Sequence, residues 1–243
     1  DDFWFVKLSS IGVIEWQKSL GGSNSEFATS IEQTTDGGYI VAGYSYSNDG
    51  DVTLNHGYAD YWIVKLSSTG TIVWQKSLGG TGDDVANSIK QTNDGGYIVA
   101  GYSYSNDGDV TGHHGTTSYA DCWIVKLTSA GTITWQKSLG GDEWDKASSI
   151  QQTSDGGYIV AGDSFSTNGN VTGNHGLTDY WIVKLTSTGT IVWQKSFGGL
   201  YGEYAKSIQQ TADGGYIVSG SGDSLDGDVT GNHGLIDYWI VKL

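Results

Sequence analysis

Acidic residues recur in one loop of this sequence at a spacing that suits metal binding. Segment 47–53 reads Ser-Asn-Asp-Gly-Asp-Val-Thr, and related segments follow at 105–111, 167–172 and 225–230. Carboxylates two residues apart around a glycine, followed by a threonine carbonyl, offer the oxygen ligands that calcium prefers. The sequence therefore predicts calcium as a cofactor. The predicted ligands are Asp49, Asp51, Asp107, Asp109, Asp226 and Asp228.

The same loop has a second interpretation that needs no ion. Aspartate and asparagine side chains accept hydrogen bonds from nearby backbone N–H groups, and glycine supplies the left-handed conformation of such turns. The third copy weakens the calcium hypothesis, because Asn168 and Asn170 are neutral there. The loops also lack the terminal glutamate of an EF-hand. The residues alone leave both interpretations open.

One histidine follows each acidic loop, in an Asn-His-Gly or His-His-Gly segment. The copies are His56, His114, His175 and His233, with His113 as an extra one. Each copy lacks a second histidine or a cysteine to complete a zinc site, and the adjacent pair 113–114 is poorly placed to bind one metal. We therefore expect a turn role, with the imidazole bonded to a loop carbonyl, and assign no metal to histidine.

A third loop leads from a Gly-Gly pair into the block typified by Ser-Ile-Gln-Gln-Thr. One position in it is acidic in every copy, and we expect its carboxylate to accept hydrogen bonds from the loop backbone. The four copies are Glu26, Asp84, Asp145 and Glu203. The aromatic residues around it are Phe27, Trp144, Tyr201 and Tyr204. Rings beside carboxylates suit glycan binding, since rings stack on sugar faces and acids accept hydroxyl hydrogen bonds; ordinary packing between neighbouring sheets is the alternative.

This pattern does not predict an enzyme. Catalytic sites gather different residues in one asymmetric arrangement, whereas the polar residues here recur once per repeat. The chain contains no Gly-x-Ser-x-Gly elbow, His-Glu-x-x-His pair or phosphate-binding loop. Cys122 replaces the tyrosine found at the equivalent positions 61, 180 and 238, which indicates a buried strand residue.

The amino-acid composition excludes some classes of binding partner. Twelve lysines, no arginine and 27 acidic residues give a formal net charge of −15, which repels nucleic acid and anionic lipid and attracts cations. Hydrophobic residues make up 37% of the chain, in runs of only a few residues, so the chain folds but holds no membrane-spanning segment. A single cysteine excludes an internal disulfide. The absence of an initiator methionine and a signal peptide indicates a mature or excised segment.

The elements that would position these loops form a tandem repeat. The segment Asp-Tyr-Trp-Ile-Val-Lys-Leu at 60–66 recurs at 2–8, 121–127, 179–185 and 237–243, with tryptophan spacings of 58, 61, 58 and 58 residues. Three further apolar blocks return in each period, at 71–77, 88–92 and 96–101 in the second copy. We expect one domain over 1–243, with repeats at 2–59, 60–120, 121–178 and 179–236 and a terminal strand at 237–243.

All four blocks have the length and the Val, Ile, Tyr and Trp content of strands, and glycine-containing turns join them. Trp62 and Val64 share one face of the first block while Tyr61 and Ile63 share the other, so both faces are expected to be covered. A four-stranded antiparallel meander in tandem predicts an all-β fold, a β-propeller of four blades of about 60 residues with an extra terminal strand. The alternatives are part of a larger seven- or eight-bladed ring and an open β-solenoid.

The first and last copies of the 60–66 type of strand would compete for one position in a closed ring. The extra strand is therefore expected to pair at a free edge, to be donated to a neighbouring molecule, or to belong to a longer array. Nine of the twelve lysines lie at two strand positions. If the Trp-Gln-Lys block is the outermost strand, its lysines would protect an exposed edge from pairing with other chains.

The repeated strings also resemble a known type of repeat. Segments 94–101, 179–185 and 191–196 read Asp-Gly-Gly-Tyr-Ile-Val-Ala-Gly, Asp-Tyr-Trp-Ile-Val-Lys-Leu and Ile-Val-Trp-Gln-Lys-Ser. They are similar to the tandem repeats of secreted and cell-surface bacterial and archaeal proteins. The resemblance covers the whole chain and implies a propeller-like fold and an extracellular or cell-surface location. The Gly-His and Trp-Asp pairs of WD40 repeats are missing, which argues against a cytosolic scaffold of that kind.

These observations predict a non-catalytic module that serves as a structural or binding scaffold at a cell surface, stabilised by calcium. Its expected partners are other copies of itself, other cell-surface proteins and glycans, with no nucleic acid and no membrane insertion. Two alternatives are a filament- or sheath-forming subunit that assembles by donating its terminal strand, and a lectin-like carbohydrate-binding module.

Overall fold

A computed structural model describes the whole chain, residues 1–243, as an all-β protein with 17 strands. It contains no helix, and so none that is long and apolar enough to cross a membrane. The strands form three four-stranded sheets, a two-stranded sheet at the N-terminus and a three-stranded sheet at the C-terminus. Within each sheet, strands that follow one another in the chain pair antiparallel. The predicted all-β class with repeated antiparallel sheets is confirmed, and discrete sheets of this kind differ from the continuous ladder of a β-solenoid.

Each complete sheet is a meander of four strands. The first strands are β3 (Glu26–Gln33), β7 (Asp84–Gln91), β11 (Asp145–Gln152) and β15 (Glu203–Gln210). The second strands are β4 (Tyr39–Ser45), β8 (Tyr97–Ser103), β12 (Tyr158–Ser164) and β16 (Tyr216–Gly222). The third strands are β1 (Phe3–Leu8), β5 (Asp60–Leu66), β9 (Asp121–Leu127), β13 (Asp179–Leu185) and β17 (Asp237–Lys242). The fourth strands are β2 (Ile14–Leu20), β6 (Ile72–Leu78), β10 (Ile133–Leu139) and β14 (Ile191–Phe197).

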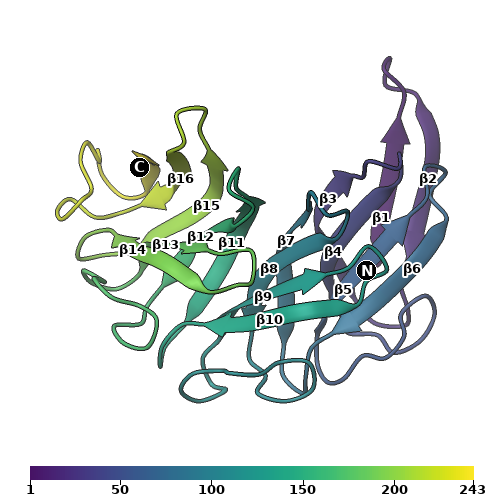
Figure 1. Cartoon of the computed structure of the whole chain (residues 1–243), viewed down its shortest axis with the longest axis horizontal. Helices are drawn as coiled ribbons and strands as arrows, with labels where there is room; N and C mark the ends of the chain where they lie inside the picture. Colours follow the sequence, from purple (N-terminus) through teal and green to yellow (C-terminus); the bar gives the residue numbers. More distant parts are fainter.

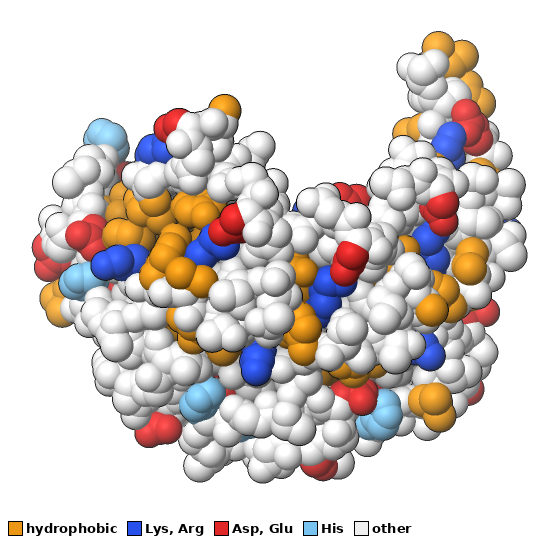
Figure 2. Space-filling view, viewed as in Figure 1, with side chains coloured by type: hydrophobic (Ala, Val, Ile, Leu, Met, Phe, Trp, Pro, Cys, Tyr) orange, Lys and Arg blue, Asp and Glu red, His pale blue; other side chains and the backbone are white.

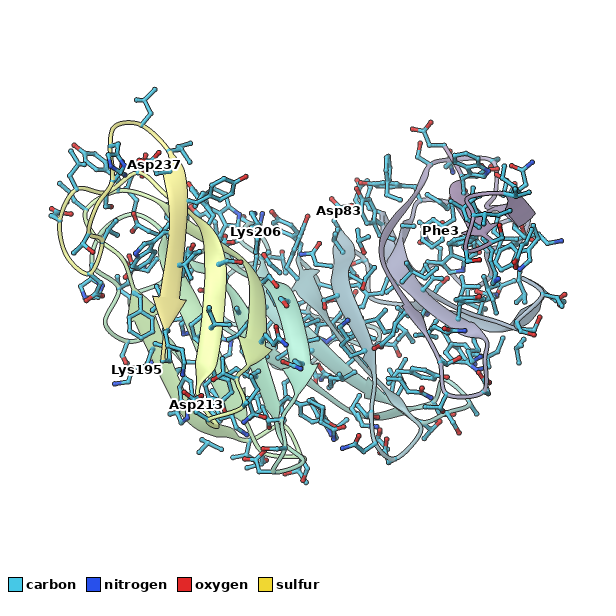
Figure 3. All side chains as sticks on the ribbon, turned by 90° about the horizontal axis from the view of Figure 1, so that it is seen from above. Phe3, Asp83, Lys195, Lys206, Asp213 and Asp237 are labelled. Atoms are coloured by element: carbon cyan, nitrogen blue, oxygen red, sulfur yellow. The ribbon has the colours of Figure 1, made fainter.

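The sheets follow one another around a U-shaped arc (Figure 1). The first strands β3, β7, β11 and β15 line its inner side, and the fourth strands β6, β10 and β14 lie on its outer side. The N-terminal hairpin β1–β2 and the sheet β15–β16–β17 stand at opposite ends of the arc. Figure 3 shows the same separation between Phe3 and Asp237, the first residues of the equivalent strands β1 and β17.

The sheets are offset from the repeats that the tryptophans mark in the sequence. Each complete sheet takes its first two strands from one sequence repeat and its last two from the next, as β3–β4 and β5–β6 do. The sequence predicted four complete four-stranded blades, and this number is wrong. Three sheets are complete, and the chain ends hold the last two strands of one sheet and the first three of another. The extra strand, β17, pairs with β16 of its own chain.

Apolar faces pack each sheet against the next. The third strands β5, β9 and β13 are buried along their whole length. Their tryptophans, at most 2% exposed, are Trp62, Trp123 and Trp181. Tyr61 shows how neighbouring sheets meet, because its ring centroid lies 4.5 Å from that of Trp123 and its hydroxyl donates to the Trp123 carbonyl at 2.9 Å. Such burial of apolar surface is the main source of stability for stacked sheets.

The lysines of the repeated strands fall into two groups. Those of the fourth strands, such as Lys76, are exposed on the outermost strand, as predicted. Those of the third strands β5, β9 and β13 are buried instead, because each pairs with the aspartate of the Asp-Gly-Gly turn in its own sheet. Lys65 Nζ lies 3.0 Å from Asp36 Oδ2. The equivalent pairs are Lys126–Asp94, Lys184–Asp155 and, at the exposed end, Lys242–Asp213.

Replacing Trp123 by alanine should lower the free energy of unfolding by about 3–5 kcal/mol, because the change leaves a cavity in the middle sheet. Trp4 is the matched control, since it occupies the equivalent position of β1 but is 66% exposed. In dilute solution Trp4→Ala should cost less than about 1 kcal/mol. Urea denaturation followed by circular dichroism measures both values. Equal losses for the two variants would contradict the packing of sheets described above.

Candidate functional site

The loops that the sequence singles out gather at one end of the sheets. They are the Gly-Gly loops before the first strands, the acidic loops after the second strands and the histidine segments before the third strands. The Asp-Gly-Gly and Ser-Ser-Thr-Gly turns lie at the opposite end. We call the first end the loop rim; in the first complete sheet it comprises 21–25 and 46–59, and the other sheets carry equivalent segments.

The acidic loops bind the backbone of the Gly-Gly loops. Asp107 Oδ1 accepts a hydrogen bond from the Thr81 N–H at 2.8 Å, and Asp109 Oδ2 accepts one from the Gly79 N–H at 3.3 Å. The corresponding pairs elsewhere are Asp49–Ser23, Asp51–Gly21, Asp226–Leu200 and Asp228–Gly198. Asn168 makes the equivalent bond through its amide oxygen, so this bond does not require a charge. No group of three or more acidic, histidine or cysteine side chains is arranged to hold a metal ion.

A buried carboxylate fixes each Gly-Gly loop from inside the sheet. Asp84 accepts hydrogen bonds from the Gly80 N–H at 2.8 Å and from the Ser105 hydroxyl at 3.0 Å. The equivalent residues Glu26, Asp145 and Glu203 each bind the second glycine of their loop. The predicted backbone-binding role of this position is confirmed. Burial raises the pKa of Asp84 to about 7 and that of Asp145 to about 6, although their hydrogen bonds act in the opposite direction.

Three histidines bind a second buried carboxylate instead of the expected loop carbonyl. The expected carbonyl contact occurs at His113 alone, whose Nε2 lies 3.4 Å from the Thr116 carbonyl oxygen. His56 Nδ1 lies 2.6 Å from Asp60 Oδ2, which also accepts a hydrogen bond from the His56 backbone N–H at 3.0 Å. The same contact recurs in the pairs His114–Asp121 and His175–Asp179. Burial raises the pKa of Asp60, and the bonds from His56 lower it. The first residues of β5, β9 and β13 thus anchor the histidine turns to their sheets.

The four predicted aromatic residues lie at separate places on the loop rim. Phe27 stacks on Tyr44 with ring centroids 5.0 Å apart. Trp144 packs edge-on against Tyr119 and Phe165, with centroid distances of 4.9 and 5.7 Å. The remaining two, exposed at the start of the last sheet, are Tyr201 and Tyr204. The structure therefore does not bring the four residues into one site.

Four tyrosines that the sequence analysis did not single out form a cleft in the loop rim. Tyr44 and Tyr46 lie at the end of β4, with ring centroids 6.0 Å apart, and Tyr102 and Tyr104 lie at the end of β8, with centroids 6.1 Å apart. A hollow of about 230 Å³ separates the two pairs, and Asp83 and Val85 complete its lining. We call this site the tyrosine cleft. Lys146 Nζ lies 4.6 Å from the Tyr102 ring centroid, a cation–π contact.

A wider hollow of about 860 Å³ lies against the same wall. Tyr44 and Tyr46 line both hollows, and Phe27 and Tyr58 contribute to the wider one. Of the four aromatic residues predicted from the sequence, Phe27 is therefore the one that lines a hollow next to the tyrosine cleft. The sequence signal that would have found the cleft is Tyr-Ser-Tyr-Ser, present at 44–47 and 102–105 but replaced in the later repeats by Asp-Ser-Phe-Ser at 163–166 and Ser-Gly-Asp-Ser at 221–224.

A third hollow, of about 630 Å³, lies on the inner side of the arc, where Lys206 is labelled in Figure 3. Serine, glutamine and lysine side chains of the first strands make up most of its lining. Several of them already link neighbouring sheets. The Ser30 hydroxyl accepts a hydrogen bond from the Ile89 N–H at 3.2 Å, and the Ser88 hydroxyl accepts one from the Ile150 N–H at 3.3 Å. These serines join the first strands of adjacent sheets.

Comparison with known proteins supports the fold and leaves the activity open. No family model matches the chain. The regulatory protein FlaEY of Caulobacter vibrioides is 25% identical over 159 residues, which are 62% of this chain but only 17% of that protein. The crystal structure of a protein of unknown function from Bacteroides caccae aligns with a TM-score of 0.52 and 12% identity, over 89% of this chain and 64% of the other. The tail fiber of Staphylococcus aureus phage P68 aligns with a TM-score of only 0.26 and 11% identity, over 91% of this chain and 50% of the other.

The calcium hypothesis predicts that excess calcium raises the melting temperature relative to chelator, and that Asp107→Asn reduces this rise. If the loop acts through hydrogen bonds alone, neither chelation nor Asp107→Asn should change stability by more than about 1 kcal/mol. The bonds made by Asn168 favour the second result. Thermal melting of both chains with calcium and with chelator separates the two interpretations.

The free energy of unfolding should fall as the pH rises from about 4 to about 7. The folded-state pKa values of Asp84 and Asp145, about 7 and about 6, lie above the ordinary value of 3.8. The folded chain therefore binds more protons than the unfolded chain in this window, and each such group contributes a slope of at most about 1.4 kcal/mol per pH unit. Asp84→Asn keeps an acceptor for the Gly80 N–H and should make the decline shallower.

Thermal melting of the unmodified chain and of Asp84→Asn, from about pH 5 to about pH 8, measures this dependence. A melting temperature that increases over the range would show that the buried carboxyl groups are already ionised at the lower pH. An unchanged slope in the variant would show that Asp84 is not the group responsible.

Proposed function

We propose that this chain is a non-catalytic binding module of propeller-type blades whose tyrosine cleft holds a carbohydrate. The observation that carries the proposal is the pairing of aromatic walls with a carboxylate: two tyrosine pairs face one hollow, and Asp83 lines it. Tyrosine rings offer flat apolar faces for sugar rings, and their hydroxyls and a carboxylate exchange hydrogen bonds with sugar hydroxyls. The adjoining wider hollow extends the same surface past Phe27 and Tyr58.

The size and openness of the two hollows suit a chain of sugars better than a small apolar ligand. The volumes of about 230 and about 860 Å³ meet at Tyr44 and Tyr46, so a ligand of several rings can contact both sides of one wall. Tyr46 is 40% exposed, which leaves part of its ring free for stacking. The loop rim is acidic and the whole chain carries a formal net charge of −15. This charge favours binding of a neutral glycan over an anionic one.

The arrangement of the sheets supports propeller-type blades. Four-stranded meanders that pack face to face, with their first strands gathered on the inner side of an arc (Figure 1), have the strand order and the stacking of propeller blades. In this proposal the three complete sheets are three blades, and the two incomplete sheets are parts of further blades.

The proposed absence of catalysis rests on how the titratable groups are used. The buried carboxylates recur from sheet to sheet, and each one binds a loop N–H or a histidine, as Asp84 and Asp60 do. Cys122 is buried in β9, as predicted, and burial raises the pKa of its thiol, which disfavours the reactive thiolate. A repeated set of structural bonds is unlike the single asymmetric arrangement that catalysis needs.

We place the module outside the cell or at its surface, where other surface proteins and glycans would be its partners. The resemblance of its repeats to those of secreted and surface proteins and its strongly acidic composition support this location. Calcium is not part of the proposed function, because Asn168 makes the equivalent backbone bond of its loop without a charge. The melting experiment above tests this choice.

A second candidate function is self-assembly, which the hydrophobic side chains exposed on the first and last sheets favour. Figure 2 shows hydrophobic side chains exposed over the C-terminal sheet and at the tip of the N-terminal hairpin. Tyr238, in β17, is 96% exposed, whereas its equivalents Tyr61 and Tyr180 are fully buried. Exposed sheet faces of this kind invite pairing with another chain.

Carbohydrate binding predicts that immobilised glycans retain the protein and that Tyr46→Ala weakens retention about tenfold, because one stacking wall is lost. An array of neutral and anionic oligosaccharides measures this. Tyr201→Ala is a matched control, since Tyr201 is exposed on the same rim but lines neither tyrosine-walled hollow. Trp144→Ala tests the separate cluster of Trp144, Tyr119 and Phe165. Failure of every glycan to retain the unmodified chain would contradict the proposal.

A further inference from the structure

We propose that the hollow of about 630 Å³ on the inner side of the arc binds a small organic carboxylate at the junction between β7 and β11. We call this hollow the inner hollow. The two strands belong to complete sheets in the middle of the chain. The inner hollow shares no lining residue with the tyrosine cleft or with the wider hollow beside that cleft, so the proposal does not depend on carbohydrate binding.

The first strand of each sheet turns alternate backbone N–H groups toward the preceding sheet. It pairs with the second strand only, and along such an antiparallel edge every other N–H points away from the ladder. Side chains of the preceding first strand accept hydrogen bonds from these groups, as the Ser88 hydroxyl does from the Ile150 N–H at 3.3 Å. Side chains rather than backbone groups therefore join neighbouring first strands.

Two of the three junctions between first strands supply a second side-chain oxygen of this kind. Between β3 and β7, Glu32 Oε2 accepts a hydrogen bond from the Gln91 N–H at 2.6 Å. Between β11 and β15, Gln151 Oε1 accepts one from the Gln210 N–H at 2.8 Å. Glu32 and Gln151 occupy equivalent positions of their strands. At this position a side chain with an oxygen acceptor satisfies the N–H of the following sheet.

The middle junction has a lysine in place of this acceptor. Lys90 is the equivalent of Glu32 and Gln151 in β7, and an ammonium group donates hydrogen bonds but accepts none. Gln152 of β11 carries the backbone N–H that faces it. The register of Gln152 with Tyr158 turns this N–H away from β12, and no oxygen of the chain accepts a hydrogen bond from it. The middle junction therefore offers two kinds of donor and lacks an acceptor for them.

The Lys90 side chain is available to a ligand in the inner hollow. It is 41% exposed, and its Nζ lies 4.0 Å from Glu32 Oε1, the limit for an ion pair. The lysine stem is flexible. From the equivalent position the shorter Gln151 side chain already reaches the N–H of the following sheet. Lys90 is therefore long enough to contact an anion held at the Gln152 N–H.

The charges that line the inner hollow favour an anion. They are Glu32, Lys90 and Lys206, so lysines outnumber acids there although the whole chain carries a formal net charge of −15. Lys206 is exposed on the inner side of the arc (Figure 3). Serine hydroxyls and glutamine side chains form most of the remaining lining, and such groups suit a polar ligand.

The chain itself shows which anion fits this position. Glu32 places a carboxylate on the Gln91 N–H, with Lys90 Nζ beside it. A carboxylate from a ligand would take the equivalent place on the Gln152 N–H, with Lys90 as its ion-pair partner. Hydrogen bonds to an ionised acceptor are roughly twice as strong as neutral ones. A second carboxylate on the same ligand would pair with Lys206, so the preferred ligand is a small dicarboxylate.

Nuclear magnetic resonance of the unmodified chain tests the site, with glutarate as the probe. In a proton–nitrogen correlation spectrum the Gln152 backbone signal should move downfield and saturate as glutarate is added at constant ionic strength, because its N–H gains an acceptor. The Gln210 signal is the internal control and should move little, since its N–H is already bonded to Gln151. No saturable shift of the Gln152 signal with glutarate or acetate would overturn the proposal. A shift with phosphate alone would also overturn it, because the site would then select another class of anion.

Variants of the lysines test the same site through its affinity. Lys90→Gln introduces the acceptor that Gln151 provides at the next junction, so the chain should fold as before and bind glutarate at least about tenfold more weakly. Lys76→Gln is the matched control, because it removes the same charge from the outermost strand β6 and should leave the affinity unchanged. Lys206→Gln should weaken glutarate binding but not acetate binding.

Calorimetric titration measures these affinities, and circular dichroism checks that each variant is folded. Equal weakening by Lys90→Gln and Lys76→Gln would overturn the proposal, because it would show a general effect of charge. Unchanged glutarate affinity in Lys90→Gln would overturn it as well. Unchanged glutarate affinity in Lys206→Gln would overturn the contact with a second carboxylate.

Discussion

Face-to-face packing of apolar sheets is the interaction on which the rest of this structure depends. The third strands β5, β9 and β13 contribute Trp, Val and Leu to one face and Tyr or Cys with Ile to the other, and both faces are buried. Because each sheet is covered only by its neighbours, no single sheet could bury both faces alone. The same requirement explains the exposed side chains at the two ends, where a neighbouring sheet is missing.

The loop rim is built on polar contacts that the packing makes possible. Two buried carboxylates per junction, such as Asp60 and Asp84, stand at the start of strands whose positions are set by the apolar core. They fix the histidine turn and the Gly-Gly loop, and the acidic loop then binds the same Gly-Gly segment from outside. A rigid rim of this kind holds the tyrosine pairs of β4 and β8 at fixed spacing, which is what a preorganised binding surface requires.

The sequence predicts the strands and turns well because each is a local pattern. Alternation and β-branched residues define the strands, and Gly70 and Gly95 take the positive φ that the two hairpin turns need. The sequence does not show where one sheet ends and the next begins, because the repeat has the same period whichever strand is counted first. The tyrosine cleft was missed for a similar reason: Tyr44 and Tyr102 are 58 residues apart and become neighbours only when two sheets stack. The partners of the histidines depended on burial of Asp60 and its equivalents, which spacing alone does not reveal.

Backbone hydrogen exchange tests the central claim most directly, since it reports how well each strand is covered by its neighbours. The account predicts the slowest exchange in the third strands β5, β9 and β13, which are buried throughout, and much faster exchange in the outermost strands β6, β10 and β14. Equal protection across all four strands of a sheet, or fast exchange in β9 of the middle sheet, would contradict it.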